Sequence, residues 1–258
     1  MATADAAGGE PGAVLTVLRS LLDLVLPATC AGCGAAETSW CPDCATTLRG
    51  PARRAAPDPG PADLPPTWAV AGYAGAVRAA VVAHKEHGVL ALTRPLGAAL
   101  ALAVRAAAVR SGAVPDGRPL ALVPAPSRAA AVRERGRDPT LRLAEAAAAV
   151  LRGDGRPVVV APVLRMRRSA RDQAGLGRGA RAANLAGAVR VARGSRARLR
   201  DHAVLLVDDV VTTGATLAEC ATVLRDDGSL VAAAAVVAAT ARDQPWGRSA
   251  LSPRSDRG

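Results

Sequence analysis

The stretch VLLVDDVVTTGATL, residues 204–217, decides the fold class. Its apolar beginning is typical of a buried strand, which we expect over residues 203–207. Two acids, a hydroxyl-rich loop with one glycine, and an Ala-rich helical pattern over 215–227 follow. Ligands of open parallel sheets bind beyond the carboxyl ends of strands, so a binding site is expected at this loop.

The same alternation of short apolar runs and helical patterns extends over most of the chain. Runs at 68–73, 120–123, 157–163 and 230–239 predict further strands, and the Ala-rich stretches 76–87, 92–110 and 141–152 predict helices. Strands that alternate with helices of this length indicate right-handed βαβ units. The sequence therefore predicts an α/β fold with a mainly parallel sheet.

The composition is aliphatic and strongly biased. Of the 258 residues 62 are Ala, Ile and Phe are absent, and 32 of the 33 basic residues are Arg. A chain of this length buries a core without help from a metal or a disulfide. Residue types with A/T-rich codons survive at Tyr73, Lys85 and Asn184, either because a substitute fails at these positions or by chance.

The net charge of +11 comes from one part of the chain. Residues 116–200 carry a net charge of +13, whereas residues 1–50 and 201–258 are both net acidic. This basic stretch is typical of a protein with a polyanionic partner, or of a solvated surface whose Arg content reflects codon bias.

The N-terminal stretch does not resemble a targeting segment. Asp5 and Glu10 precede the first cation, Arg19, which is the wrong order for a secretory signal. The apolar run 14–26 is too short and too interrupted to span a bilayer, so we expect a cytoplasmic protein without membrane insertion. A role at a membrane surface is disfavoured because the polar face lacks a row of cations. The apolar residues of the run have the spacing of an amphipathic packing helix: Val14, Leu15, Val17, Leu18, Leu21, Leu22 and Val25.

Four of the five cysteines form a metal-binding pattern. Cys30, Cys33, Cys41 and Cys44 read C-x2-C-x7-C-x2-C, and four thiolates close a tetrahedral Zn²⁺ shell with no open position. We expect a structural zinc in a small ribbon-like module; free or redox-active thiols and an iron-sulfur centre are the alternatives. Cys220 is expected to pack as a small hydrophobe.

The chain divides into four parts. We expect the N-terminal helix and zinc module over 1–50, and a Pro-rich linker over 51–66, where six prolines favour extended backbone. The main domain is expected over 67–240, and a disordered tail over 241–258.

The loop after the decisive strand combines two chemistries. Asp208 and Asp209 can accept hydrogen bonds from a cis-diol or help to hold a hydrated Mg²⁺. The following residues offer hydroxyl donors, backbone N–H groups and a helix N-terminus, which together suit a phosphate. Diol and phosphate together indicate a ribose 5-phosphate. The alternatives are a solvated acidic turn with a Thr cap and a receiver-like acidic Mg²⁺ pair.

Residues 204–217 resemble the phosphoribosyl pyrophosphate (PRPP) motif of type I phosphoribosyltransferases. Over residues 20–240 the chain resembles the ComF family of competence-associated proteins. Besides the cysteines, Tyr73 and Lys85, the resemblance rests on VPAPSRAAAVRERG at 123–136 and LRMRRSARDQAGLGRGARAANLAGAVRV at 164–191.

The resemblance implies a type I phosphoribosyltransferase-like fold and a role for each matching residue. Asp208 and Asp209 would contact the ribose hydroxyls, and Lys85 and Arg168 would join them as catalytic residues. The 5-phosphate would bind to the loop of Thr212, Thr213, Gly214, Ala215 and Thr216, and the pyrophosphate with Mg²⁺ beside Pro126 and Arg128. A flexible loop over the pyrophosphate would contain Arg165, Arg168, Arg171, Gln173, Arg181 and Asn184.

The chain departs from the family in two places. After Arg135 and Gly136 the family usually continues Phe-Asn-Gln, whereas this chain has Arg137, Asp138 and Pro139. A second cysteine pair that many members carry is replaced by the Pro-rich stretch, so a single zinc site is expected.

Two functions are compatible with these observations. The first is a phosphoribosyltransferase with an unidentified acceptor. The second is a competence factor that handles single-stranded DNA together with competence-machinery proteins and uses PRPP as a regulatory ligand. Because aromatic residues are scarce, any DNA binding would depend on backbone electrostatics.

Overall fold

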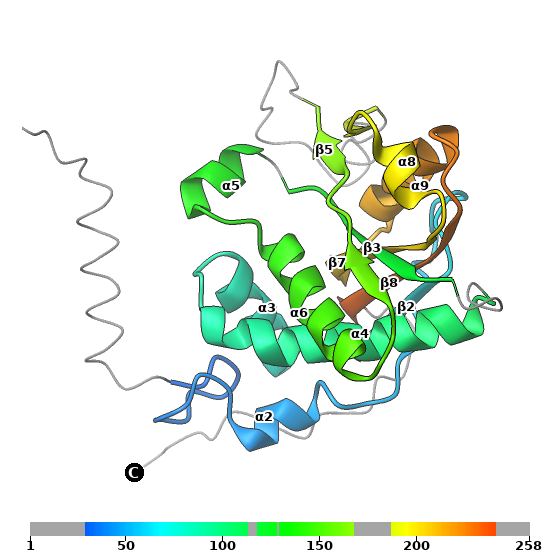
Figure 1. The fold of residues 1–258 in the computed structure, drawn as a ribbon. Helices are drawn as coiled ribbons and strands as arrows, with labels where there is room; N and C mark the ends of the chain where they lie inside the picture. The colour runs from blue at the N-terminus through cyan, green and yellow to red at the C-terminus, as the bar shows by residue number, and fades with distance from the viewer. Residues whose placement is uncertain (1–28, 113–117, 128, 168–186, 241–258) are drawn as a thin grey trace, which may run out of the picture.

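A computed structural model describes residues 29–112, 118–127, 129–167 and 187–240 of the chain (Figure 1). The helix expected at 14–26 and the tail at 241–258 lie outside these residues. The same holds for Arg128 and for most of the expected flexible loop, including Arg168, Arg171, Gln173, Arg181 and Asn184.

The centre of the molecule is a six-stranded sheet of order β1-β2-β8-β7-β3-β4. The strands are β1 (Arg53–Arg54), β2 (Thr67–Gly72), β8 (Val231–Ala239), β7 (Ala203–Val211), β3 (Leu120–Pro124) and β4 (Val158–Val160). All neighbours are parallel except β1, which runs antiparallel to β2 at the edge. The predicted α/β fold with a mainly parallel sheet is confirmed.

Helices cover both faces of the sheet. On one face lie α3 (Gly75–Lys85), α4 (Thr93–Arg110), which follows the short 3-10 helix η1 (Leu90–Leu92), and α6 (Pro139–Gly153). On the other lie α8 (Ser195–Leu199) and α9 (Ala215–Asp226). In Figure 1, α4 runs along the length of the sheet beneath the green and orange strands.

Small side chains allow these helices to approach closely. A Cβ on Gly97 of α4 would lie 2.4 Å from the Cβ of Ala146 in α6, so only glycine fits at this crossing. Leucines from the helices and strands, among them Leu100, Leu143 and Leu205, fill the space between helix and sheet and are fully buried. The Ala-rich composition therefore forms the tight aliphatic packing that a core without Phe or Ile requires.

Several elements differ from the sequence expectations. Strand β7 continues through Val211, because Val210 and Val211 still pair with β8, so both acids lie inside the strand rather than after it. Strand β4 is shorter than the apolar run 157–163. The chain also forms α2 (Pro42–Thr46), α5 (Ala129–Arg135) and a two-stranded antiparallel sheet of β5 (Leu164–Met166) and β6 (Val189–Val191).

Part of the Pro-rich stretch 51–66 belongs to the sheet. Arg53 and Arg54 form β1, and the Arg54 guanidinium lies 5.3 Å from the ring centroid of Trp68 in β2. Farther along, the side chain of Leu64 packs against the second face of the sheet. The stretch is therefore fastened to the main domain at both ends.

Within the part of the chain that the structure describes, the segment Leu90–Arg110 alone has the length and hydropathy of a membrane span. Its mean hydropathy is 1.4 over its most apolar window, of which 56% is buried inside the protein. This segment comprises η1 and the core helix α4, so packing against the sheet accounts for much of its apolar character.

Candidate functional site

The four cysteines of the N-terminal module converge on one point. Their sulfur atoms all lie within 4.8 Å of one another, with Cys30, Cys41 and Cys44 buried and Cys33 exposed. The Sγ atoms of Cys33 and Cys41 are 3.6 Å apart. A tetrahedral zinc with Zn–S bonds of about 2.3 Å places its sulfurs about 3.8 Å apart. The four residues are thus positioned to bind a metal, as the spacing predicts.

Backbone N–H groups prepare these sulfurs for metal binding. The N–H of Cys41 donates to Cys30 Sγ at 3.3 Å, and the N–H of Cys44 donates to Cys41 Sγ at 3.4 Å. Burial raises the pKa of Cys30, but hydrogen bonds from backbone N–H groups, first that of Cys41, outweigh it and lower the pKa to about 6. Burial raises the pKa of Cys44. A cation among the sulfurs would favour the thiolate form of all four.

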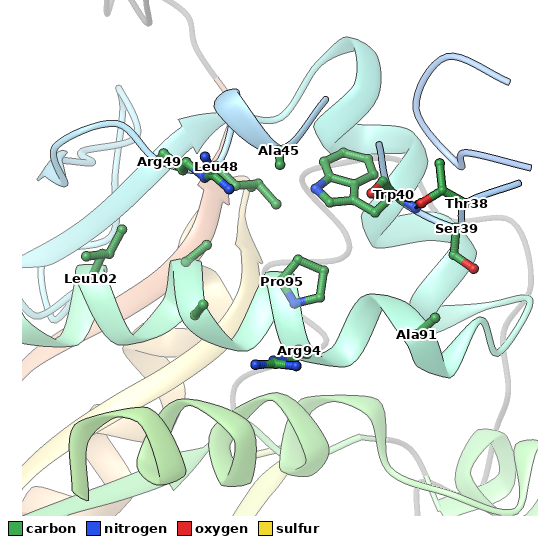
Figure 2. A pocket seen from close by; sticks show the side chains of 12 residues that line it. Thr38, Ser39, Trp40, Ala45, Leu48, Arg49, Ala91, Arg94, Pro95 and Leu102 are labelled. Carbon is green, nitrogen blue, oxygen red and sulfur yellow. Dashed lines mark hydrogen bonds between the residues drawn. The ribbon is translucent and has the colours of Figure 1, made fainter. Parts of the chain in front are cut away.

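The cysteine module packs directly against the main domain. A Cβ on Gly32 would lie 2.6 Å from Cys44 Sγ and 2.8 Å from the Cβ of Ala76 in α3, so the first knuckle requires glycine for close contact. Gly34 has a φ of +79°, the left-handed conformation that completes the turn. Figure 2 shows Trp40, which also packs against the cysteines, between the module and α4. The module is therefore seated on α3 and α4.

A second candidate site lies at the carboxyl end of β7. Here a pocket of about 310 Å³ opens between β7, α3 and the loop before α9. Its lining contains carboxylates, an ammonium group, a phenol and hydroxyls in one small volume: Tyr73, Val81, Val82, Lys85, Glu86, Asp208, Asp209, Val210, Thr212 and Thr216. The location agrees with the rule for ligands of parallel sheets.

An ion pair joins α3 to β7 in this pocket. Lys85 Nζ lies 2.6 Å from Asp209 Oδ2, and the Asp209 side chain is only 7% exposed. Burial by itself would lower the pKa of Lys85, but the charges of Asp209 and Asp208 outweigh it and raise the pKa. The ammonium group is therefore held in its charged form next to the two acids.

In contrast to Lys85, Asp208 is favoured in its uncharged form. Burial, followed by the adjacent charge of Asp209, raises the pKa of Asp208 well above its ordinary value. The backbone N–H of Asp209 donates to its Oδ1 at 2.8 Å, and the N–H of Val210 donates to Asp209 Oδ1 at the same distance. Asp208 therefore retains its proton to higher pH than an ordinary aspartate does, and a cation or a hydroxyl donor in the pocket would favour its ionisation.

The loop after β7 turns sharply into α9. Gly214 has a φ of +77° and is the residue before the first helical turn. A Cβ at this position would lie 2.8 Å from Cδ2 of Leu64, so the space beside Gly214 is already filled by a side chain from the Pro-rich stretch. Glycine is needed here for backbone conformation and for contact with Leu64.

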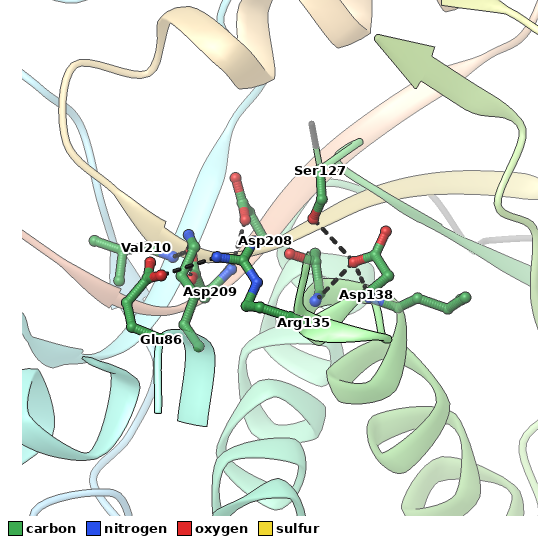
Figure 3. Close-up of polar contacts among 10 residues, drawn as sticks. Glu86, Ser127, Arg135, Asp138, Asp208, Asp209 and Val210 are labelled. Atoms are coloured by element: carbon green, nitrogen blue, oxygen red, sulfur yellow. Dashed lines mark hydrogen bonds and ion pairs between the residues drawn. The ribbon is translucent and has the colours of Figure 1, made fainter. Parts of the chain in front are cut away.

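The neighbouring strand end brings a second turn to the same edge of the sheet. The N–H of Ala125 donates to the carbonyl of Val207 at 2.9 Å, which places the turn after β3 beside the acids. Ser127 Oγ donates to Asp138 Oδ1 at 3.0 Å, and Asp138 also accepts from the N–H groups of Thr140 and Leu141 (Figure 3). The departure from the Phe-Asn-Gln pattern thus supplies the N-cap of α6 and an anchor for the turn.

Arg135 extends from α5 toward the mouth of the pocket. Its Nη1 lies 2.8 Å from Glu86 Oε2, while its Nε is buried without a hydrogen-bond partner among the described residues. Figure 3 shows Glu86 and Arg135 on the same side as Asp208 and Asp209. A guanidinium group is thus available at the rim.

The structure brings part of the expected site together in one pocket and places other expected residues outside it. Lys85, both acids and two of the loop threonines line one pocket, and Tyr73 joins them from the end of β2. Thr213 is exposed on the loop, Pro126 is half-buried in the neighbouring turn, and Arg165 is exposed on β5. The residues that the sequence reasoning did not assign to the site are Val81, Val82, Glu86 and Val210. Their only sequence signal is proximity to Lys85 or to the acids.

A second surface carries a group of exposed arginines. They extend from β5, β6 and α8 and from the segments that follow, and none forms an ion pair with another described residue: Arg165, Arg167, Arg190, Arg193, Arg196, Arg198 and Arg200. This surface, called the arginine surface below, gives a structural location to part of the basic stretch found in the sequence.

No family model matches the chain, and no curated protein matches it.

Proposed function

We propose that the pocket at the end of β7 binds PRPP together with Mg²⁺ and that the chain is a phosphoribosyltransferase with a type I fold. The observation that carries this proposal is the grouping of Lys85, Asp208, Asp209, Thr212 and Thr216 around one pocket at the carboxyl end of a parallel strand. The resemblance of residues 204–217 to the PRPP motif supports the same ligand.

Each part of PRPP has a matching group. The carboxylates of Asp208 and Asp209 accept hydrogen bonds from the two ribose hydroxyls, for which uncharged or cationic residues would be poorer partners. The 5-phosphate binds to the loop 212–216 at the N-terminus of α9, where backbone N–H groups and the helix dipole favour an anion. The pyrophosphate extends toward the turn of Pro126 and Ser127, with Arg135 at the rim.

The proposed reaction transfers the ribosyl group. The bond between C1 of the ribose and the pyrophosphate oxygen breaks, pyrophosphate leaves with the bonding electrons, and an acceptor nucleophile forms the new bond to C1 and loses a proton to solvent. Bound Mg²⁺ would offset charge on the pyrophosphate. The protein contributes position and electrostatics: Lys85 adds positive charge beside the acids, and the carboxylates stabilise positive charge that develops on the ribose ring.

For the cysteine module we propose a structural Zn²⁺. All four coordination positions are filled by protein thiolates, which leaves no open position for catalysis. The metal would stabilise a module that packs on the main domain through the close approach of Gly32 to Ala76.

Release of pyrophosphate is the direct test of the transferase proposal. Purified protein is incubated with PRPP and Mg²⁺, with and without a panel of nucleobases, amines and other nitrogen nucleophiles, and pyrophosphate is measured. Acceptor-dependent release that is lost in Asp209→Asn supports the proposal. Absence of PRPP binding by calorimetry would reject it.

The arginine surface favours a second candidate function, the binding of single-stranded DNA by a competence factor. Seven exposed guanidinium groups without carboxylate partners in the described part of the chain suit a phosphate backbone. In this function PRPP would act as a regulatory ligand at the β7 pocket, and DNA binding would respond to it without turnover.

A further inference from the structure

A groove of about 530 Å³ separates the cysteine module from helix α4. Figure 2 shows Trp40, Ala45 and Leu48 on the module side, facing Pro95 and Leu102 on α4. Most of the lining is apolar. Its charged members are Arg49 and Arg94, and no carboxylate is among the described residues that line it.

The outer face of η1 and α4 extends this apolar surface. Leu90 is 48% exposed and Val109 is 68% exposed. Between them, Ala98 and Leu102 lie four residues apart on the same outward face of the helix and line the groove. Arg94 and Arg105 share this face, and Arg105 pairs with Asp154, so the apolar part of the face around Ala98 and Leu102 is the part that lines the groove.

Trp40 contributes its indole ring to the groove. Its Nε1 is buried and has no hydrogen-bond partner among the described residues, so an occupant of the groove would contact the ring rather than this N–H.

We propose that the groove between the module and α4 is filled by the chain's own residues 14–26, bound as an amphipathic helix. The sequence of this segment has two distinct faces at helical spacing. One face is apolar and includes Val14, Leu18, Leu21 and Val25, and the opposite face is polar: Thr16, Arg19, Ser20 and Asp23.

The length and position of the segment suit this binding site. Thirteen helical residues span about 20 Å, and α4, with 18 residues, spans about 27 Å, so the segment fits along α4. Only Pro27, Ala28 and Thr29 separate its end from Cys30, which anchors the module next to the groove.

Charge favours the same occupant. The proposed segment 14–26 contains one acid, Asp23, and one cation, Arg19, and Asp5 and Glu10 precede it. It therefore brings no net positive charge to a groove whose two arginines have no carboxylate partner in the lining. A second copy of the chain would offer α4 the same apolar face but bring two further arginines to the interface.

Quenching of tryptophan fluorescence in the full chain tests the proposal. In a Trp246→Ala background the emission comes from Trp40 and from Trp68, which is buried in the core, so acrylamide reports mainly on Trp40. With the groove occupied, Trp40 is shielded. Leu18→Asp with Leu21→Asp should release the segment and raise the quenching constant severalfold, and the matched pair Thr16→Asp with Ser20→Asp, which adds the same charge on the polar face, should leave it unchanged.

A substitution on the other side of the contact keeps the test independent of the segment's own folding. Ala98→Glu places a carboxylate on the groove floor and should raise the quenching constant as the leucine pair does, with the metal content and thermal unfolding of the main domain retained. An unchanged quenching constant in both variants, or an equal rise in the polar-face control, would overturn the proposal. So would a dimer, by light scattering, that Ala98→Glu dissociates and the leucine pair does not, since this identifies a second copy as the occupant.

Discussion

Lys85 Nζ lies 2.6 Å from Asp209 Oδ2, a contact that joins the end of α3 to the middle of the sheet across 124 positions of sequence. The carboxylate is nearly buried and the ammonium is 37% exposed, so the pair sits at the boundary between core and pocket. This contact gives a physical reason for the single lysine of the chain. A guanidinium is larger and planar, and it delivers its charge through a fork rather than through one compact ammonium group.

Removal of Lys85 should be costly for stability. Lys85→Met leaves the Asp209 carboxylate without its cation, and we expect the free energy of unfolding to fall by about 1–3 kcal/mol. The double variant Lys85→Met with Asp209→Asn should recover part of this loss. Urea unfolding measures both. Arg105→Met, which removes an exposed ion pair with Asp154, is the control and should cost about 0–1 kcal/mol; an equal cost for the two pairs would contradict the prediction.

Variants of the β7 pocket should lose PRPP. Asp209→Asn removes acceptor capacity at constant size, and Gly214→Val forces a β-branched residue into a left-handed conformation against Leu64, which displaces the loop. We expect each to weaken Mg²⁺-dependent binding at least tenfold, or about 1.4 kcal/mol, by calorimetry. Asp226→Asn, an exposed acid at the end of α9, should bind normally. Wild-type affinity in both pocket variants would mean that the ligand site lies elsewhere.

The affinity for PRPP with Mg²⁺ should rise with pH through the acid range. Because the pKa of Asp208 is raised by burial and by the charge of Asp209, its proton competes with the ligand above the ordinary range of an aspartate. In the absence of ligand the same shift has the opposite effect on folding. The folded state binds the proton more tightly than the unfolded chain, so stability falls as the pH rises from the unfolded pKa to the folded one. Asp208→Asn should remove the contribution of this carboxyl to both slopes and so make each of them less steep, as calorimetry and urea unfolding at several pH values would show.

Metal analysis should find one zinc per chain. Cys41→Ser removes a ligand that also caps α2, so we expect loss of the metal and a less stable module, with the main domain still folded. Elemental analysis and thermal unfolding provide the measurement. Cys220→Ser, a buried cysteine of α9 outside the cluster, should retain the zinc. Iron, or no metal, in the wild type would reject the assignment.

Binding of single-stranded DNA, if it occurs at the arginine surface, should weaken steeply with salt. The expected log-log slope is about −0.7 per phosphate contacted, with little sequence preference. Arg167→Glu, Arg196→Glu and Arg198→Glu together should flatten it, and Arg110→Glu, at the exposed end of α4, should not. If PRPP regulates DNA binding, each ligand changes the affinity of the other by the same factor. If the affinity for single-stranded DNA does not change with salt concentration, or if no binding is found at low salt, the transferase remains the better proposal.

The sequence predicted those elements in which local pattern and tertiary environment agree. The bounds agree within a few residues for strands β2, β3 and β8 and for helices α3, α4, α6 and α9. The strands are buried on both faces and therefore appear in the sequence as continuous apolar runs, and the helices appear as Ala-rich periodic stretches. The expected end of β7 was too early because aspartates disfavour strands. In the structure, pairing of Val210 and Val211 with β8 overrides that preference.

Features that depend on distant contacts left no local signal. The strands β5 and β6 have three residues each and pair across a long interval, which no periodicity can detect. The motif located Asp208, Asp209 and the loop, and codon bias singled out Lys85. The placement of Glu86 and Arg135 at the pocket follows instead from the packing of α3 and α5, which no short motif encodes.

The contact of Leu64 with Gly214 makes the Pro-rich stretch a support for the loop of residues 212–216. One end of the stretch is fixed in the sheet by β1, and the other is fixed by Leu64 and by the carbonyl of Asp63, which accepts from Arg225 Nη1 at 3.1 Å. Because both ends of the stretch are fixed, a change in its length would displace the segments that it connects. Insertions or deletions between residues 55 and 62 should therefore shift the loop that turns into α9, although they lie far from it in sequence.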